Sequence, residues 1–248
     1  MQRLLFFVLC LALAGCAAVS VPESRRASIQ NVAVVSAIGD DFGLTRIGLI
    51  VFSNERRTEK IEFGFDQVAQ QTVEQVLRER RADVKVIPVQ YDSNALSAKI
   101  NKIESFQPYA DPKRIEPELR SLIQGKPIDT IILVGRGRES PGARSVEGIG
   151  IYTERTLRER AIITPYAGIS VFILDARSME ILAKGERVAE GAVYNVNPLI
   201  SSKPLGGPAP FLAGFAFPIN EEQRQFLDAP MKDLVRATVR RLLDQTAP

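Results

Sequence analysis

Few side chains in this chain are suited to covalent or acid-base chemistry. The 248 residues include no histidine and two cysteines, Cys10 and Cys16. Histidine is the commonest general base and the commonest metal ligand, so its absence excludes Ser-His and Cys-His nucleophile pairs and a zinc site. Carboxylate, lysine and tyrosine chemistry stay open in principle. We expect a protein that uses no cofactor and no metal.

The most suggestive polar residues are two adjacent carboxylates, Asp40 and Asp41. They lie in the glycine-flanked segment Gly39–Gly43, directly after an apolar run. A turn at the end of a buried strand is a common place for ligand binding in α/β sheets. The pattern therefore predicts either a cation or polar-ligand turn, or ordinary hydrophilic turn chemistry.

Cys16 is the other chemically distinctive residue. It follows the positive Arg3 and an apolar run, Leu4–Ala14, of about eleven residues, which is within the range of a signal peptide. A membrane-spanning helix needs about 20 residues. We expect residues 1–15 to be a cleaved signal peptide.

The residues Leu13, Ala14, Gly15 and Cys16 resemble the lipobox of bacterial lipoproteins. The resemblance implies that Cys16 receives a diacylglyceryl thioether, that the chain is cut before it, and that the new amino group is acylated with a fatty acid such as palmitate. Ala17 follows where Asp would favour inner-membrane retention. The resemblance therefore implies an outer-membrane lipoprotein on the periplasmic side, with the inner membrane as the alternative.

The composition is that of an ordinary globular protein, with 45% hydrophobic and 25% charged residues and a net charge of +3. This balance argues against a nucleic-acid partner. We expect residues 16–28 to form the lipid anchor and a tether. Residues 29–248 are expected to form a single periplasmic domain with an apolar loop, rich in proline and glycine, at 195–218.

The apolar pattern predicts an α/β (α+β) fold, with a mixed sheet, amphipathic helices packed against it and a late antiparallel hairpin. Buried strands are expected at Asn31–Ile38 and Asp129–Gly135, a further strand at Leu44–Ser53, and the hairpin at Gly168–Arg187. Helices are expected over Asp66–Arg81, twice between Ser93 and Gln124, and over Glu221–Asp244 with a break near its start at Pro230. Asn54–Lys60 is expected as a polar turn and Thr153–Arg160 as a charged connection.

These elements carry a second resemblance. The run Val32–Val35, the helix behind it, the run Asp129–Val134 and the hairpin with Asp175–Leu182 at its turn are similar to a type of envelope lipoprotein domain. This type comprises the curli secretion lipoprotein, the penicillin-binding-protein activator lipoproteins and the amino-terminal domain of TolB. The resemblance implies a role in binding or assembly and no catalytic residues.

The segment 195–218 is long for a loop and unusually apolar. We interpret five of its residues as contacts for a partner, another copy or lipid: Leu205, Phe211, Leu212, Phe215 and Phe217. The alternative is an irregular flap packed on its own domain.

Three functions follow from these observations. The first is a non-enzymatic adaptor or assembly factor of the bacterial cell envelope, attached to the membrane through Cys16 and bound to another envelope protein or to itself. The second is a ring component of an outer-membrane secretion or export system. The third is a carboxylate-based enzyme or cation-binding protein that uses Asp40, Asp41 or Asp175.

Overall fold

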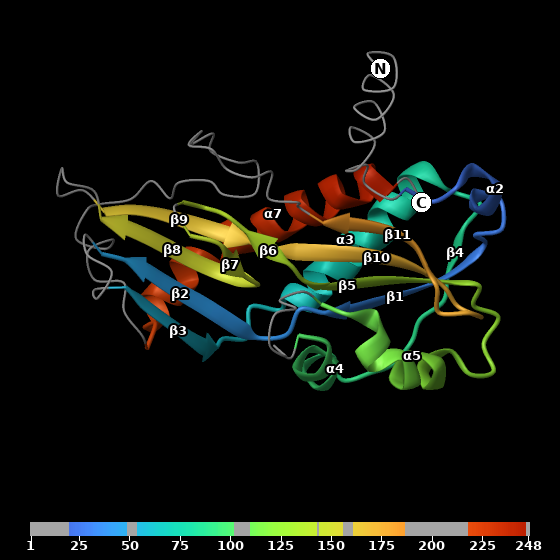
Figure 1. Cartoon of the computed structure of the whole chain (residues 1–248), viewed down its shortest axis with the longest axis horizontal. Helices are drawn as coiled ribbons and strands as arrows, with labels where there is room; N and C mark the ends of the chain where they lie inside the picture. Colours follow the sequence, from blue (N-terminus) through green and yellow to red (C-terminus); the bar gives the residue numbers. More distant parts are fainter. Residues whose placement is uncertain are drawn as a thin grey trace, which may run out of the picture.

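The protein is an elongated α/β molecule built on two β-sheets that follow one another along its long axis (Figure 1). The computed structural model describes residues 20–48, 54–101, 110–142, 144–155, 161–186 and 218–246. The five-stranded sheet has the order β11-β10-β5-β1-β4, and the four-stranded sheet has the order β3-β2-β8-β9. A two-stranded ribbon pairs β6 with β7. The predicted mixed α/β class is therefore confirmed.

The elements have the following bounds. The strands are β1 (Asn31–Ala37), β2 (Asp41–Ile47), β3 (Glu55–Lys60), β4 (Lys85–Val86), β5 (Thr130–Arg136), β6 (Arg138–Glu139), β7 (Val146–Glu147), β8 (Ile149–Arg155), β9 (Ala161–Ala167), β10 (Ile169–Asp175) and β11 (Ile181–Glu186). The helices are α2 (Glu23–Arg26), α3 (Phe65–Arg80), α4 (Ser93–Ile100), α5 (Glu116–Ile123), α7 (Glu221–Thr246) and the 3₁₀ helix η2 (Pro112–Ile115).

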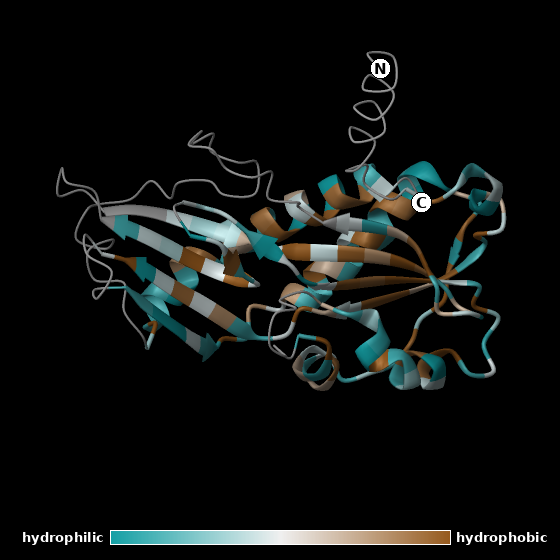
Figure 2. Cartoon of the chain, viewed as in Figure 1, coloured by the Kyte–Doolittle hydropathy of each residue, from teal (hydrophilic) through white to brown (hydrophobic). Residues whose placement is uncertain are grey.

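The five-stranded sheet is covered by helices on both faces. Val32 and Val34 of β1 lie in the core that also contains α3 and α7, whereas Ala33 and Val35 face α4, η2 and α5. Burial on both faces explains why β1 and β5 read as continuous apolar runs, and Figure 2 shows brown hydrophobic residues along these strands. The strands β4, β1 and β5 are parallel, and β10 and β11 form the predicted antiparallel hairpin.

Helix α7 joins the two halves of the molecule. Its 26 residues span about 39 Å, and it contacts α3, β9, β10 and β11. The prediction that Pro230 breaks this helix is wrong, because α7 continues through that position. Proline removes one backbone hydrogen bond there, and the fully buried Leu227 and Met231 on either side hold the helix against the core.

The four-stranded sheet differs most from the prediction. Residues Glu55–Lys60, predicted as a turn, form the edge strand β3, which Figure 2 shows as hydrophilic. Strand β2 begins at Asp41 inside the predicted turn, and β8 extends into the predicted charged connection at Thr153–Arg160. Charged side chains on an edge strand prevent its open edge from pairing with another chain. They also replace the alternating apolar residues by which a strand is recognised in a sequence, so such a strand is easily missed.

Three glycines connect the two sheets. Gly137 follows β5, Gly148 precedes β8, and Gly168 separates β9 from β10. Their backbones form a closed ring of hydrogen bonds, because Gly137 N–H donates to the carbonyl of Gly168 (2.8 Å), Gly168 N–H to that of Gly148 (2.7 Å) and Gly148 N–H to that of Gly137 (3.1 Å). We call these residues the glycine junction.

The chain enters this fold at Val21, which is 1% exposed and belongs to the main core. Its N–H donates to the carbonyl of Thr246 at the end of α7 (3.1 Å). Within the segment 16–28 that the sequence predicts as anchor and tether, Val21 is thus packed in the core of the domain, whereas α2 has no buried residue. None of the helices in the described parts of the chain has the length and hydropathy needed to cross a membrane.

Candidate functional site at the sheet junction

Asp40 lies where the chain passes from β1 to β2, beside helix α4. Its carboxylate accepts a hydrogen bond from the side-chain amide of Asn94 (2.6 Å), and its N–H donates to the amide oxygen of the same residue (3.2 Å). The reciprocal pair closes the turn against α4. Asp40 therefore acts here as a turn residue bound by a protein amide.

Asp41, the first residue of β2, is held between two cations. Its carboxylate lies 3.1 Å from the Lys60 ammonium and 3.1 Å from the Arg136 guanidinium. Partial burial alone would raise the pKa of Asp41, but the two cations outweigh it and hold the pKa below its ordinary value. The structure thus separates the roles of the two predicted ligand residues, because Asp40 binds an amide and Asp41 binds protein cations.

Arg136 connects the ends of β1, β5 and β2. Its side chain is 14% exposed, and its Nε donates to the carbonyl of Ile38 (2.6 Å). Its Nη1 forms the ion pair with Asp41, while Nη2 is buried without a hydrogen-bond partner among the described residues. Arg136 was not singled out by the sequence as a site residue, although it directly follows the strand predicted at Asp129–Gly135 and is the last residue of β5.

Asp66 organises the same region from the first turn of α3. Its carboxylate accepts hydrogen bonds from the Ser36 hydroxyl (2.6 Å), from Ile38 N–H (2.8 Å) and from Gly39 N–H (3.0 Å). A carboxylate is also favoured there by the positive end of the helix dipole. Asp66 therefore fixes the path of the chain as it leaves the five-stranded sheet.

A partly buried tyrosine completes this network. The Tyr91 hydroxyl accepts hydrogen bonds from Ser36 N–H (2.6 Å) and from the Gln70 side chain. Burial raises the pKa of Tyr91 to about 12, so its hydroxyl stays neutral at physiological pH. Tyr91 serves here as a neutral hydrogen-bonding group and not as a base.

We expect Asp66→Ala to lower the free energy of unfolding by about 2 kcal/mol, because three donors near the end of β1 lose a charged acceptor. Chemical denaturation followed by circular dichroism measures the change. Asp66→Asn keeps one acceptor oxygen and should lose roughly half as much. Equal stability of Asp66→Ala and wild type would show that the carboxylate is not what holds this turn.

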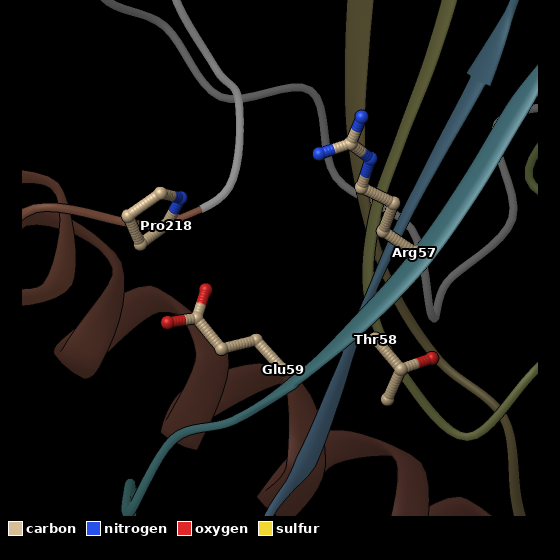
Figure 3. Close-up of a pocket in the computed structure, with 4 residues that line it drawn as sticks. All are labelled: Arg57, Thr58, Glu59 and Pro218. Atoms are coloured by element: carbon tan, nitrogen blue, oxygen red, sulfur yellow. The ribbon is translucent and has the colours of Figure 1, made fainter.

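A shallow surface hollow of about 480 Å³ lies beside β3, with Arg57, Thr58, Glu59 and Pro218 among its lining residues. Figure 3 shows Arg57 and Glu59 on one side of the strand, facing the space next to Pro218. Glu59 accepts a hydrogen bond from Ile219 N–H (3.2 Å), and Arg57 pairs with Glu55. These polar groups are thus bound to neighbouring parts of the chain.

The remaining predicted site residues lie outside the described residues. These are the lipobox Leu13, Ala14, Gly15 and Cys16, and the apolar contacts Leu205, Phe211, Leu212, Phe215 and Phe217. Of the segment 195–218, only Pro218 is among the described residues, and it lies beside β3. The described chain before it stops at Glu186, and Gly185 lies against Leu242 and Thr246 of α7. In the described part of the chain, no three acidic or sulfur side chains are grouped to hold a metal ion.

Fold and site together define an α/β protein of two sheets whose polar junction is occupied by its own side chains. No family model and no curated protein matches the chain at a significant level. Among solved structures, it is similar to the lipoprotein GNA1162 from Neisseria meningitidis, with 14% sequence identity over 64% of this chain and 80% of that chain and a TM-score of 0.29. At so low a TM-score the likeness carries no structural or functional conclusion.

Proposed function

We propose that this chain is a lipid-anchored lipoprotein of the bacterial cell envelope that acts as a non-enzymatic adaptor or assembly factor. The observation that carries the proposal is the order Leu13-Ala14-Gly15-Cys16 at the end of an apolar run. Two or more acyl chains on Cys16 hold a protein stably on a membrane, whereas one chain holds it only marginally. By the same resemblance, the membrane is the outer one and the domain faces the periplasm.

The contacts of the predicted site residues Asp40 and Asp41 support a binding role over an enzymatic one. Asp40 and Asp41, two of the three carboxylates expected to act in the enzyme alternative, are bound by Asn94, Lys60 and Arg136. The third, Asp175, accepts hydrogen bonds from the backbone N–H groups of Arg177 and Ser178. Lys60 and Arg136 bind the two oxygens of the Asp41 carboxylate, one each, whereas Asn94 binds one oxygen of Asp40. The ion pair between Asp41 of β2 and Arg136 of β5 therefore has a structural role, because it links the two sheets.

The contact surface of the adaptor is the apolar segment 195–218. The described chain stops at Glu186, the last residue of β11 in the five-stranded sheet, and resumes at Pro218 beside β3 of the four-stranded sheet. Aromatic residues in such a segment suit a protein interface, where they contribute most of the buried area.

We expect a variant with Phe211→Ser, Phe215→Ser and Phe217→Ser to lose its partner. The measurement is the native mass of the lipoprotein after gentle detergent extraction from its own envelope. Wild type should migrate above the mass of one mature chain, together with a second protein, and the variant should migrate as one chain. Ile181→Ser is the matched control, because Ile181 is an exposed apolar residue of β11 outside this segment.

Two results would contradict this assignment. A fall in the thermal midpoint of the triple variant would show that the aromatic residues belong to the core. A native mass that is a discrete multiple of the chain mass would favour the ring component of a secretion or export system.

A further inference from the structure

The point at which the chain enters the fold is fixed by several contacts. Val21 is buried, and its carbonyl accepts a hydrogen bond from the Arg26 Nε (3.2 Å). Arg81, directly after α3, donates to the carbonyls of Arg26 (3.2 Å) and Ile29 (3.0 Å). Together with the bond from Val21 to Thr246, these contacts hold α2 to the carboxyl ends of α3 and α7.

The distance from the acylated residue to this point is short. Cys16 precedes Val21 by five residues in the sequence, and an extended chain spans at most about 3.6 Å per residue, or about 18 Å in all. If Cys16 is acylated, as proposed above, the membrane surface lies within about 18 Å of Val21. The ends of α3 and α7 must then be close to the lipid headgroups.

This part of the molecule is strongly basic. We define the anchor-side surface as residues 23–26, 77–85 and 236–246, which are α2, the end of α3 with the following turn, and the last three turns of α7. It holds nine basic residues against four acidic ones, while the whole chain carries only +3, so the rest of the chain is acidic. The basic residues are Arg25, Arg26, Arg78, Arg80, Arg81, Lys85, Arg236, Arg240 and Arg241.

Most acids of the anchor-side surface are already paired within it. Glu79 binds Arg240 (2.8 Å), Asp244 binds Arg80, and Asp83 binds Arg81 (2.8 Å). The first two pairs join α3 to α7, the third lies within the turn after α3, and together they leave a surplus of positive charge.

Two of the surplus arginines are well exposed. The Arg25 side chain is 54% exposed, and its nearest carboxylate, Asp175, is 3.8 Å away. Arg78 is exposed on α3 and has no ion pair among the described residues. Both guanidinium groups are therefore accessible to an external anion.

We propose that the anchor-side surface docks on the phosphate headgroups of anionic phospholipids and so fixes the orientation of the domain on the membrane. The inference rests on the proposed lipid anchor, which brings this surface within reach of the bilayer. Each arginine near an anionic membrane surface strengthens binding by about fivefold. The attraction extends over about one Debye length, roughly 8–10 Å in physiological salt.

The test uses the mature chain from residue 16 with Cys16→Ser, so that no acyl chain contributes. It is sedimented with vesicles of phosphatidylcholine alone or with added phosphatidylglycerol. We expect binding only to the anionic vesicles and loss of binding in high salt. Arg25→Glu with Arg78→Glu should weaken binding at least about tenfold, since it removes two favourable charges and adds two unfavourable ones.

The matched control is Arg56→Glu with Arg57→Glu, which makes the same charge change on the exposed edge strand β3. This control should change the affinity for anionic vesicles by no more than about twofold relative to the parent chain. That change is small compared with the loss expected for Arg25→Glu with Arg78→Glu. Equal losses in both double variants would show attraction by net charge alone and would overturn the proposal. Absence of binding to anionic vesicles by the parent chain would overturn it as well.

Failure of this proposal is distinguishable from failure of the lipid anchor. The vesicle experiment contains no lipid on the protein, whereas acylation is read from palmitate labelling of the intact lipoprotein. If Arg25→Glu with Arg78→Glu unfolds at a lower temperature than the parent chain, a milder variant replaces it. Arg25→Gln with Arg78→Gln removes only the positive charges, and it should still weaken vesicle binding more than Arg56→Gln with Arg57→Gln.

Discussion

Replacing Cys16 by Ser should abolish incorporation of labelled palmitate into the protein, because serine lacks the thiol that forms the thioether. The same loss should remove the stable attachment that several acyl chains give. A serine at this position also leaves the signal peptide uncut if cleavage depends on the lipid. The cleaner location test replaces residues 1–16 by the signal peptide of a soluble periplasmic protein, and the product should appear in the osmotic-shock fluid.

Cys10→Ser is the matched control for this experiment. It makes the same chemical change six residues earlier, inside the apolar run, and should leave palmitate labelling and membrane attachment unchanged. Palmitate label retained in Cys16→Ser, or lost equally in Cys10→Ser, would show that Cys16 is not the acylated residue. Both positions precede the described residues, which begin at residue 20.

Gly168→Ala should lower the free energy of unfolding by about 3 kcal/mol. A Cβ atom at this position would lie 2.5 Å from the carbonyl oxygen of Gly137 and 3.0 Å from the carbonyl carbon of Arg138. Both are backbone atoms, in or directly beside the glycine junction, so no side-chain rotation relieves the contact. For a protein of this size the thermal midpoint should fall by about 6–12 °C.

Gly125→Ala provides the comparison for this prediction. Gly125 has a φ of +74° and no neighbour within 4 Å of an added Cβ, so its substitution costs only the backbone strain of about 1–2 kcal/mol. Thermal unfolding followed by circular dichroism ranks the two variants. A smaller loss for Gly168→Ala than for Gly125→Ala would mean that the junction yields to the added methyl group.

The five-stranded sheet could be predicted because its strands are buried on both faces. β1 and β5 consist almost entirely of buried residues, and α3 presents a regular apolar stripe, so each signal is local to one segment. The four-stranded sheet could not be predicted in this way. Its β2 and β8 pair in parallel across more than a hundred residues, and its edge strand β3 carries charge at nearly every position.

In the candidate site, too, some residues could be predicted from the sequence and others could not. Asp40 and Asp41 were found because acidic residues after a strand are visible in the sequence, but their partners were not. Asn94, Lys60 and Arg136 come from three different elements, and only the packing of those elements brings them together. Asp66 was missed for a related reason, since a carboxylate in the first turn of a helix is common and its bonds to β1 depend on how α3 lies on the sheet.

The path of α7 also determines when this protein is able to fold during its biosynthesis. The last helix supplies Leu227, Met231, Val235, Val239 and Leu242 to the core of both sheets, and its final turn holds Val21. The first and last described parts of the chain thus meet, and the core stays open until α7 is present. If Cys16 is acylated after export, as proposed above, a chain translocated from its amino terminus would meet the acylating enzymes while still unfolded. Under the same proposal, premature termination before α7 would leave an acylated but unfolded chain, exposed to the proteases of the envelope.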